Sequence, residues 1–470
     1  MDTSCRSGSR RPALLVHLAV VLAVCAAGAT AFAAPAAATV PSPGDVTAWS
    51  VYNGAGNIDD QFRDATRGPY GAVYACGIDG SNGTASGDAL VVRYSTGGGQ
   101  VWQYHARPVG TTSAEGDAVA VDANGNVAVA GRAWNGGNFD IFVFKLDATG
   151  TKQWLATTVG AADDFDSASD VVFDRQGDVY VCGDVDDGAK AFVTKYAAAP
   201  DPAHPLTGRV LWTNTMTARA GGEAWFGGLA VDREGRVYVS GARTAANGHP
   251  DCVLRKIRPG GGTAWTRTWG GPAHKGDEGD EVILRDGRLF VGGGSFRFGH
   301  RDDLLMLRYD TGGHLKWART WDDPAHQDDS FWDMEVDGHG NAYIAGETYL
   351  SSTKSAGEVA KWSATGVRRW ARYYKGANNA RNIDYRSLEV NSAGTAWVTG
   401  IVRSSPFHLL AIRYSAAGKR AWTCSWAGPP GYVGATSHAS ALSGTNRLFT
   451  AGDTYTFPTL HDAIGVWIVR

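Results

Sequence analysis

Tryptophan recurs eight times along the 470-residue chain at intervals of 52 to 58 residues, each time shortly after a turn motif. The eight residues are Trp49, Trp102, Trp154, Trp212, Trp265, Trp317, Trp370 and Trp422. A regular period of this length indicates an array in which each copy buries its apolar surface only against its neighbours. We therefore expect eight related units, and not two or three unrelated domains.

Two further ladders share this spacing: a glycine that ends an apolar stretch, and a Lys or Arg in the next stretch. The glycines are Gly77, Gly131, Gly183, Gly241, Gly293, Gly346, Gly400 and Gly452. The basic residues are Arg93, Lys145, Lys195, Lys256, Arg308, Lys361, Arg413 and Arg470. We expect the tryptophans to pack between units and the glycines to allow a bulge or a backbone turn. We expect the basic residues to pair with carboxylates at turns or strand edges.

Each unit is expected to contain four β-strands. In the second copy, residues 118–121, 127–131, 140–146 and 153–157 are strand-like, and Asp, Asn and Gly fill the turns after the first and third of them. No segment has sustained helical periodicity. The 62 glycines, 17 tryptophans and 19% charged residues agree with many short strands joined by tight turns.

The two ends of this array complement each other. Residues 467–470 form the third strand of the last copy, with no fourth strand after them, whereas residues 47–52 form a fourth strand with none before it. Radial stacking of four-stranded sheets buries both faces of each sheet. The sequence therefore predicts an all-β fold: an eight-bladed β-propeller of four-stranded antiparallel blades, whose last blade is completed by the N-terminal strand.

The repeat motif resembles that of a known class of proteins. The pattern Asp-x-x-Gly-Asn-Val-x-Val-x-Gly is matched best by residues 122–131, 174–183 and 337–346, and it resembles bacterial secreted β-propeller repeats of the SBBP type. Residues 147–154 also resemble the tryptophan-docking repeat of quinoprotein propellers, although they are one residue shorter. The resemblance covers nearly all of residues 45–470 and implies a propeller fold and export, but no single activity.

The N-terminal segment has the features of a secretory signal. Arginines precede an apolar run and small-x-small cleavage sites, which predicts a signal peptide over 1–33, a Pro/Ala-rich linker over 34–44 and the propeller over 45–470. An uncleaved anchor is the alternative. We expect a secreted or cell-envelope-associated, soluble monomer. We expect the four cysteines left after cleavage, Cys76, Cys182, Cys252 and Cys424, to be buried free thiols and not disulfides.

The longer connections, between the second and third strands and between units, are expected to share one face of the ring. Aromatic and acidic residues gather in them, and binding residues are often carried on such loops. The expected binding residues are Trp134, Phe296, Phe298, Tyr349, Tyr455, Asp164, Asp166, Asp328 and Asp329. The acids could bind a cation such as Ca²⁺ or a basic partner; alternatively, each could accept hydrogen bonds from the backbone of its own turn.

Two similar loops, 272–277 and 324–329, each combine histidine with carboxylates. His274, Asp277 and His326 form a candidate site for Zn²⁺ or another transition metal. The alternative is a duplicated blade with solvated histidines.

Sequence motifs for catalysis are largely absent, and we assign no catalytic residue. The formal net charge of −3 argues against electrostatic binding of nucleic acid. We expect a binding scaffold for a glycan or an extracellular protein. The alternative is a propeller enzyme, either a quinoprotein-like oxidoreductase or a polysaccharide lyase or hydrolase.

Overall fold

The computed structural model describes residues 46–52, 60–80, 87–158, 160, 164–273, 275–296, 302–324, 326–351, 353–376, 382–444, 447–455 and 461–469. The chain divides into two compact units, Met1–Val40 and Pro41–Arg470, and every described residue belongs to the second. The expected signal peptide and linker thus lie outside the described residues. In the described part of the chain, no helix has both the length and the apolar character needed to span a bilayer.

The described residues form 32 strands and one short 3₁₀ turn, Pro69–Gly71. The strands are β1 Val46–Tyr52, β2 Gln61–Arg67, β3 Val73–Asp79, β4 Asp88–Tyr94, β5 Gln100–Ala106, β6 Ser113–Val121, β7 Val127–Trp134, β8 Phe139–Leu146, β9 Lys152–Thr158, β10 Ser167–Phe173, β11 Val179–Val185, β12 Lys190–Asp201, β13 His204–Thr217, β14 Ala224–Val231, β15 Val237–Thr244, β16 Pro250–Ile257, β17 Thr263–Trp269, β18 Glu281–Arg285, β19 Arg288–Phe296, β20 Asp302–Asp310, β21 Leu315–Trp321, β22 Asp329–Val336, β23 Ala342–Ser351, β24 Lys354–Trp362, β25 Arg368–Tyr374, β26 Asn382–Val390, β27 Ala396–Arg403, β28 His408–Tyr414, β29 Arg420–Trp426, β30 Ala439–Ser443, β31 Arg447–Tyr455 and β32 His461–Val469.

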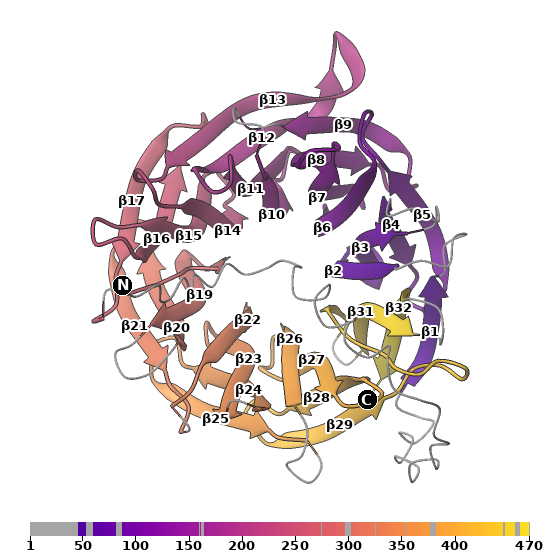
Figure 1. Ribbon diagram of the computed structural model, residues 1–470, viewed down its shortest axis with the longest axis vertical. Helices are drawn as coiled ribbons and strands as arrows, with labels where there is room; N and C mark the ends of the chain where they lie inside the picture. Colours follow the sequence, from indigo (N-terminus) through magenta and orange to yellow (C-terminus); the bar gives the residue numbers. More distant parts are fainter. Residues whose placement is uncertain are drawn as a thin grey trace, which may run out of the picture. The chain divides into compact units, whose positions relative to one another are not determined.

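Neighbouring strands pair antiparallel in groups of four, and each group is called a blade here. Blades 1 to 7 are β2–β5, β6–β9, β10–β13, β14–β17, β18–β21, β22–β25 and β26–β29, and the remaining group is β30–β32 with β1. In Figure 1 the first strand of each blade lies innermost, and it contacts the first strand of the next blade until β30 meets β2. The predicted all-β fold of four-stranded antiparallel sheets is confirmed.

Ring closure occurs where the sequence predicts it. Strand β1 pairs antiparallel with β32, from Val46 opposite Ile468 to Tyr52 opposite Ala463. The longest repeat interval, 58 residues, also has a structural reason: the β12–β13 hairpin is extended, and Thr207 in it forms a parallel bridge to Leu155 of the preceding blade. Figure 1 shows this hairpin extending beyond the ring.

The recurring glycines lie where the first strand of a blade crosses closely over the second. A Cβ atom added at any of the eight would lie 1.8 to 2.3 Å from a backbone carbonyl oxygen of the opposing segment. In six blades the strand pairing shifts register by one residue at this point, for example between Phe331 and Asp333 opposite Gly346. The predicted bulge is therefore confirmed in these blades, and only glycine has room opposite it.

The tryptophans and basic residues join neighbouring blades. In blade 5, Trp317 Nε1 and Arg308 Nη1 both donate to the carbonyl oxygen of Ala364 in the next blade, at 3.2 and 3.3 Å. Trp102 and Arg93 share Ala148 in the same way. The tryptophan prediction is confirmed for these residues. Trp49 departs from the ladder: Ala48 pairs with Trp467 at the ladder position, Trp49 is 46% exposed beside Trp426 of blade 7, and Trp467 lies against Gly98 of blade 1 in its place. The prediction for the basic ladder is only partly correct, because these side chains donate more often to a carbonyl oxygen of a turn than to a carboxylate.

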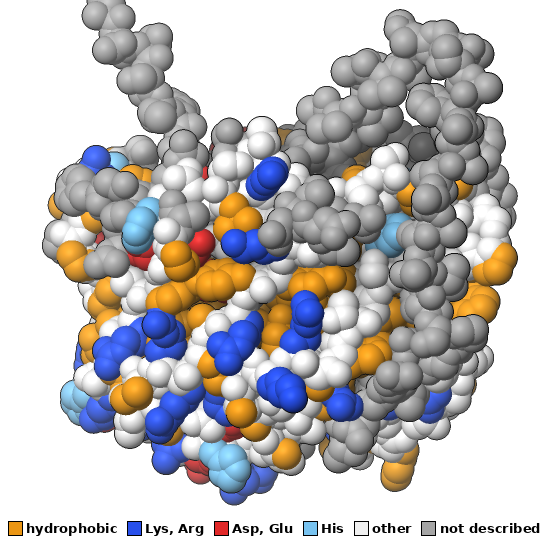
Figure 2. Space-filling model, turned by 90° about the horizontal axis from the view of Figure 1, so that it is seen from below, with side chains coloured by type: hydrophobic (Ala, Val, Ile, Leu, Met, Phe, Trp, Pro, Cys, Tyr) orange, Lys and Arg blue, Asp and Glu red, His pale blue; other side chains and the backbone are white. Residues whose placement is uncertain are grey.

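The outer wall of the ring is rich in basic side chains. Figure 2 views this wall from the side of β25 and β29 and shows Lys and Arg among hydrophobic side chains. Several of these arginines support the fold. Arg319 donates to Gly366 O at 2.7 Å and stacks on Trp317, and Arg372 does the same with Gly418 and Trp370. The four cysteines of the described region are buried thiols that form no disulfide, as predicted.

Candidate binding face and central channel

The connections between the second and third strands of a blade, and between one blade and the next, form the loop face. On it lies a cluster of three aromatic side chains from two successive connections. Trp134 and Phe139 face each other across the β7–β8 pair, with ring centroids 5.0 Å apart, and Phe165 in the loop before β10 lies 6.0 Å from Phe139. Phe165 is 49% exposed. We call these three residues the aromatic cluster.

The backbone around the aromatic cluster is held by hydrogen bonds. Asp187 N donates to Phe165 O, and Asp166 N donates to Phe139 O, both at 2.9 Å. Asn138 Nδ2 donates to the carbonyl oxygen of Asp164, whose side chain is exposed. A backbone that is already held by hydrogen bonds loses little conformational entropy when a ligand binds to the side chains it carries. The structure therefore places two predicted binding residues, Trp134 and Asp164, at one preorganised surface.

The buried acids in the connections between blades accept hydrogen bonds from the backbone of their own loops. Asp166 accepts from Gly160 N at 2.6 Å, and Asp277 accepts from Gly271 N at 2.6 Å. Asp329 accepts from Asp323 N at 3.1 Å, again six residues earlier. Each of these three acids makes the backbone bond of the second reading, and a cation or basic partner at the same acids stays a prediction. Recurrence of the backbone bond in three blades marks it as a requirement of the fold.

The remaining predicted binding residues are dispersed on the loop face. Phe296 is half-buried at the end of β19, Tyr349 is 37% exposed in β23, and Asp328 accepts a hydrogen bond from Asp302 N. Tyr455 ends β31, but its side chain is not among those described, and Phe298 lies outside the described residues. These residues do not form a second aromatic cluster within the described region.

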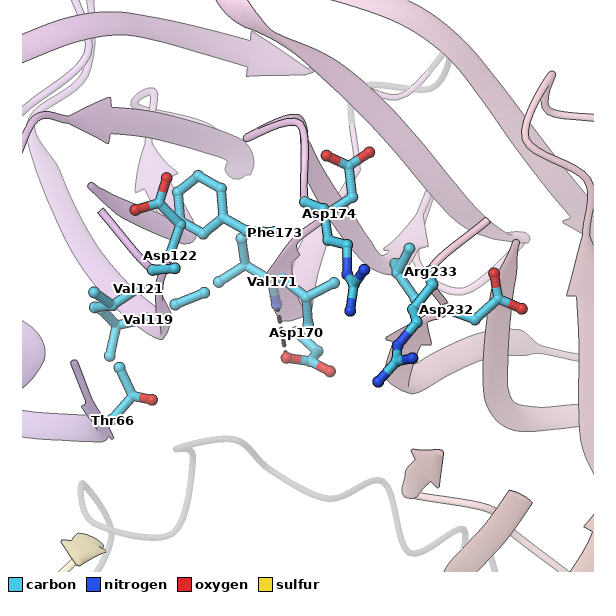
Figure 3. A pocket seen from close by; sticks show the side chains of 15 residues that line it. Thr66, Val119, Val121, Asp122, Asp170, Val171, Phe173, Asp174, Asp232 and Arg233 are labelled. Carbon is cyan, nitrogen blue, oxygen red and sulfur yellow. Dashed lines mark hydrogen bonds between the residues drawn. The ribbon is translucent and has the colours of Figure 1, made fainter. Parts of the chain in front are cut away.

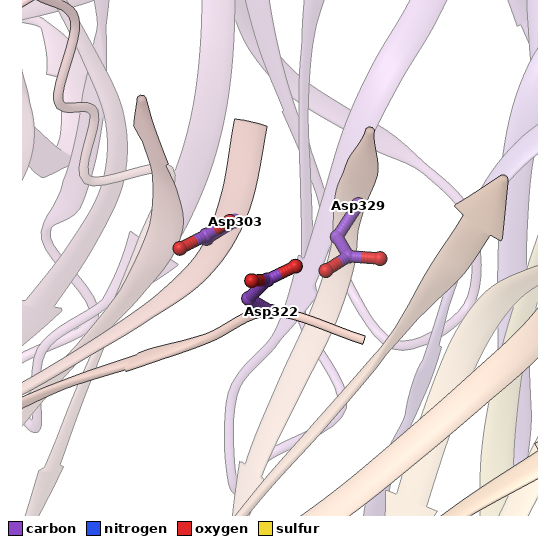
Figure 4. Close-up of side chains that lie close together, drawn as sticks. All are labelled: Asp303, Asp322 and Asp329. Carbon is purple, nitrogen blue, oxygen red and sulfur yellow. The ribbon is translucent and has the colours of Figure 1, made fainter. Parts of the chain in front are cut away.

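The predicted transition-metal triad stays a prediction, because His274 lies outside the described residues. Asp277 is fully buried and accepts from Ser295 Oγ at 2.6 Å as well as from its own loop. His326 is exposed, and its Nδ1 lies 2.7 Å from Asp322 Oδ2. Asp322 instead belongs to a different group, in which Asp303, Asp322 and Asp329 bring one carboxylate oxygen each within 4.8 Å of one another (Figure 4).

A ring of acids on the innermost strands was not predicted. Asp64 of blade 1 accepts a hydrogen bond from Val119 N of blade 2 at 2.8 Å. Three more acids accept in the same way from the first strand of the next blade: Asp170 from Leu229 N, Glu281 from Met334 N and Asp333 from Leu388 N. Burial raises the pKa of Asp64 to about 6 and that of Asp170 and Asp333 to about 7. Because four blades repeat the bond, we assign these acids to blade alignment and not to catalysis. Three of them lie thirteen residues before a ladder glycine, a spacing that could have revealed them.

A cavity of about 670 Å³ opens at the opposite end of the inner strands from the loop face. Its lining comes from the ends of β6, β10 and β14 and the turns that follow, and it includes Asp170, Arg175 and Arg233 (Figure 3). The sequence offered no reason to expect a cavity here, because the turns that form its rim are short and repetitive.

Comparison with known proteins shows the fold alone. No family model and no curated protein matches the chain, so the SBBP-type resemblance stays a prediction. Among solved structures, the chain is similar to quinohemoprotein alcohol dehydrogenase ADHIIG from Pseudomonas putida HK5 (TM-score 0.51, 12% identity, 90% of this chain and 76% of that one). It is also similar to Sqt1 from Chaetomium thermophilum (TM-score 0.52, 9% identity, 90% and 100%). Fold and comparisons together define the chain as a β-propeller protein. Proteins of this class include enzymes and scaffolds.

Proposed function

We propose that this chain is an exported binding scaffold that holds a glycan on its loop face. The observation that supports the proposal is the aromatic cluster, Trp134, Phe139 and Phe165, held on fixed backbone beside the exposed side chain of Asp164. Export rests on the signal-like segment 1–33, and N-terminal sequencing of the secreted protein tests it.

The chemistry of the aromatic cluster suits a sugar. Aromatic rings offer a large apolar surface with few rotatable bonds, and the C–H face of a pyranose packs on such a surface. A polar group next to the cluster can bond hydroxyl groups at the sugar's edge, because Asp164 is exposed. Arg132, stacked over Phe139 and paired with Glu115, fixes the ring from beneath.

A glycan array with the purified secreted protein tests this proposal, followed by titration calorimetry of the best ligand. We expect Phe165→Ala and Trp134→Ala to weaken binding about tenfold or more, which corresponds to roughly 1.4 kcal/mol. Tyr70→Asn is the matched control, because Tyr70 is a 97% exposed aromatic in the turn between β2 and β3, at the other end of the strands. No binding on the array, together with capture of an envelope protein that needs Phe165, would move the proposal from a glycan to a protein ligand.

A further inference from the structure

Three carboxylates from three separate elements meet at the junction of blades 5 and 6. Asp303 comes from β20, Asp322 from the loop after β21, and Asp329 from the start of β22 (Figure 4). Asp303 and Asp329 are 0% and 1% exposed. A buried group of like charges is costly, because each carboxylate loses hydration and repels the others.

The fold itself does not require this concentration of charge. The preceding junction has a loop of the same length, in which 269–277 corresponds to 321–329. Where that loop has Gly270, Gly271 and Gly276, this one has Asp322, Asp323 and Asp328. Asp277 and Asp329 occupy matching positions and make the same bond to their own loop. The additional acids are therefore particular to this junction, as expected of a single binding site.

A fourth carboxylate at this junction also departs from the repeat. Glu358 lies opposite the ladder glycine of its blade, Gly346, where the other seven blades have Leu, Phe, Val or Ile: Leu90, Phe142, Phe192, Val253, Leu305, Leu410 and Ile464. Glu358 is fully buried, and its Oε1 accepts from Trp321 Nε1. Tyr373 is a second hydrogen-bond partner of Glu358, and the strongest interaction of Glu358 with another charge is with Asp329.

Asp329 lies in the same buried junction. Its Oδ2 accepts a hydrogen bond from Asp323 N of its own loop, and its carboxylate is also paired with the hydroxyl of Thr348, opposite it in the β22–β23 pair. Carboxylates gathered in this way at one buried point are the arrangement expected of a cation site, because hard cations take oxygen ligands.

We propose that the junction of β20 and β22 binds one Ca²⁺ ion, with Asp303, Asp322 and Asp329 as its carboxylate ligands. Calcium takes oxygen ligands at 2.3–2.6 Å in flexible geometry, so two oxygens on opposite sides of one ion are about 4.6–5.2 Å apart. Oxygens that all lie within 4.8 Å of one another can therefore share one ion. Bound there, the ion joins two blades and fixes the loop that carries His326.

Titration calorimetry and thermal unfolding with CaCl₂, in the absence of any glycan, test this proposal. The aromatic cluster lies between blades 2 and 3, so its failure to bind a glycan would leave this result unaffected. We expect one ion per chain and a higher Tm with calcium. Asp322→Gly restores the residue of the sister loop, and it should keep the fold while weakening calcium binding about tenfold or more. Asp322→Asn serves if the glycine variant does not fold.

The matched control is Asp277→Asn at the equivalent position of the preceding junction. It removes a carboxylate with the same backbone bond, and we expect it to change stability while leaving calcium affinity within about twofold. The proposal is overturned if the folded wild-type chain shows neither heat nor a Tm change at millimolar calcium. Equal calcium affinity in both Asp322 variants and the wild type would overturn it as well.

Discussion

At the scale of single residues, the structure depends on positions where one atom decides whether two strands can cross. The ladder glycines are such positions, because a backbone carbonyl occupies the space that a side chain would need. A flexible neighbour could move aside, but a backbone carbonyl within a sheet can do so only if the strand moves.

We predict that Gly293→Ala destabilises the chain by about 3 kcal/mol or more, because its Cβ would lie 2.1 Å from Glu278 O. Its neighbour in β19 is the control: a Cβ at Gly294 meets nothing within 4 Å, so Gly294→Ala should change stability by less than about 1 kcal/mol. Urea unfolding of both variants measures the difference. Equal losses would show that the crossing is not the constraint.

Particular residues show which parts of the fold and of the candidate sites could be predicted from the sequence. The roles of the glycines and of most ladder tryptophans were predictable because the copies repeat them. The register of Trp49 was not, because only the strand pairing shows that Ala48 takes the ladder position. Trp134 and Asp164 were predicted from their loops, but Phe139 was not, because it resembles any apolar residue that starts a strand. Glu358 was equally hidden, since its significance lies in replacing an apolar residue at a position that only the strand pairing aligns.

At the scale of elements, the inner strands are held together by acids that are costly to ionise. Burial raises the pKa of Asp64, Asp170 and Asp333, and that of Glu335 to about 8. These side chains keep some contact with solvent, which screens part of the effect. In an unfolded chain such groups titrate near pH 4. Between about pH 4 and 8 the folded state thus binds more protons through them, and their contribution to the unfolding free energy falls as pH rises.

We predict that Glu335→Gln flattens this dependence and makes the chain more stable than wild type at pH 8, with little difference at pH 4. The amide oxygen can still accept the 3.1 Å bond that Val336 N donates to Glu335. Glu234→Gln, at an exposed turn, is the control and should follow the wild-type profile. Unfolding in urea at several pH values gives the comparison, and an unchanged slope in Glu335→Gln would contradict it.

At the scale of the whole molecule, the ring depends on one pairing that no other blade needs. The sequence predicted this closure because an unmatched fourth strand at one end and an unmatched third strand at the other are visible without any structure. What it could not predict is the cavity beside the turns that follow β6, β10 and β14, which depends on how the inner strands are spaced and tilted around the ring.

We predict that deleting residues 45–52 destabilises the propeller by roughly 5 kcal/mol, because about five inter-strand hydrogen bonds of about 1 kcal/mol each are lost. Exposing the edge of β32 should also cause association. Calorimetry and size-exclusion chromatography measure both effects, and a peptide of residues 45–53 added in trans should reverse them. Thr47→Ala, which loses a single 3.3 Å bond to Trp467 O, is the control. A truncated chain with wild-type Tm would refute the prediction.

The pairing of β1 with β32 also constrains the order of folding. Thr47 and Trp467 are 420 positions apart, so β1 has no partner until β32 has been synthesised. During synthesis, the earlier blades can form as local hairpins while β1 remains unpaired. We therefore expect the pairing of β1 with β32 to be the slow step of folding. Before it forms, we expect proteases and chaperones to reach the nascent protein.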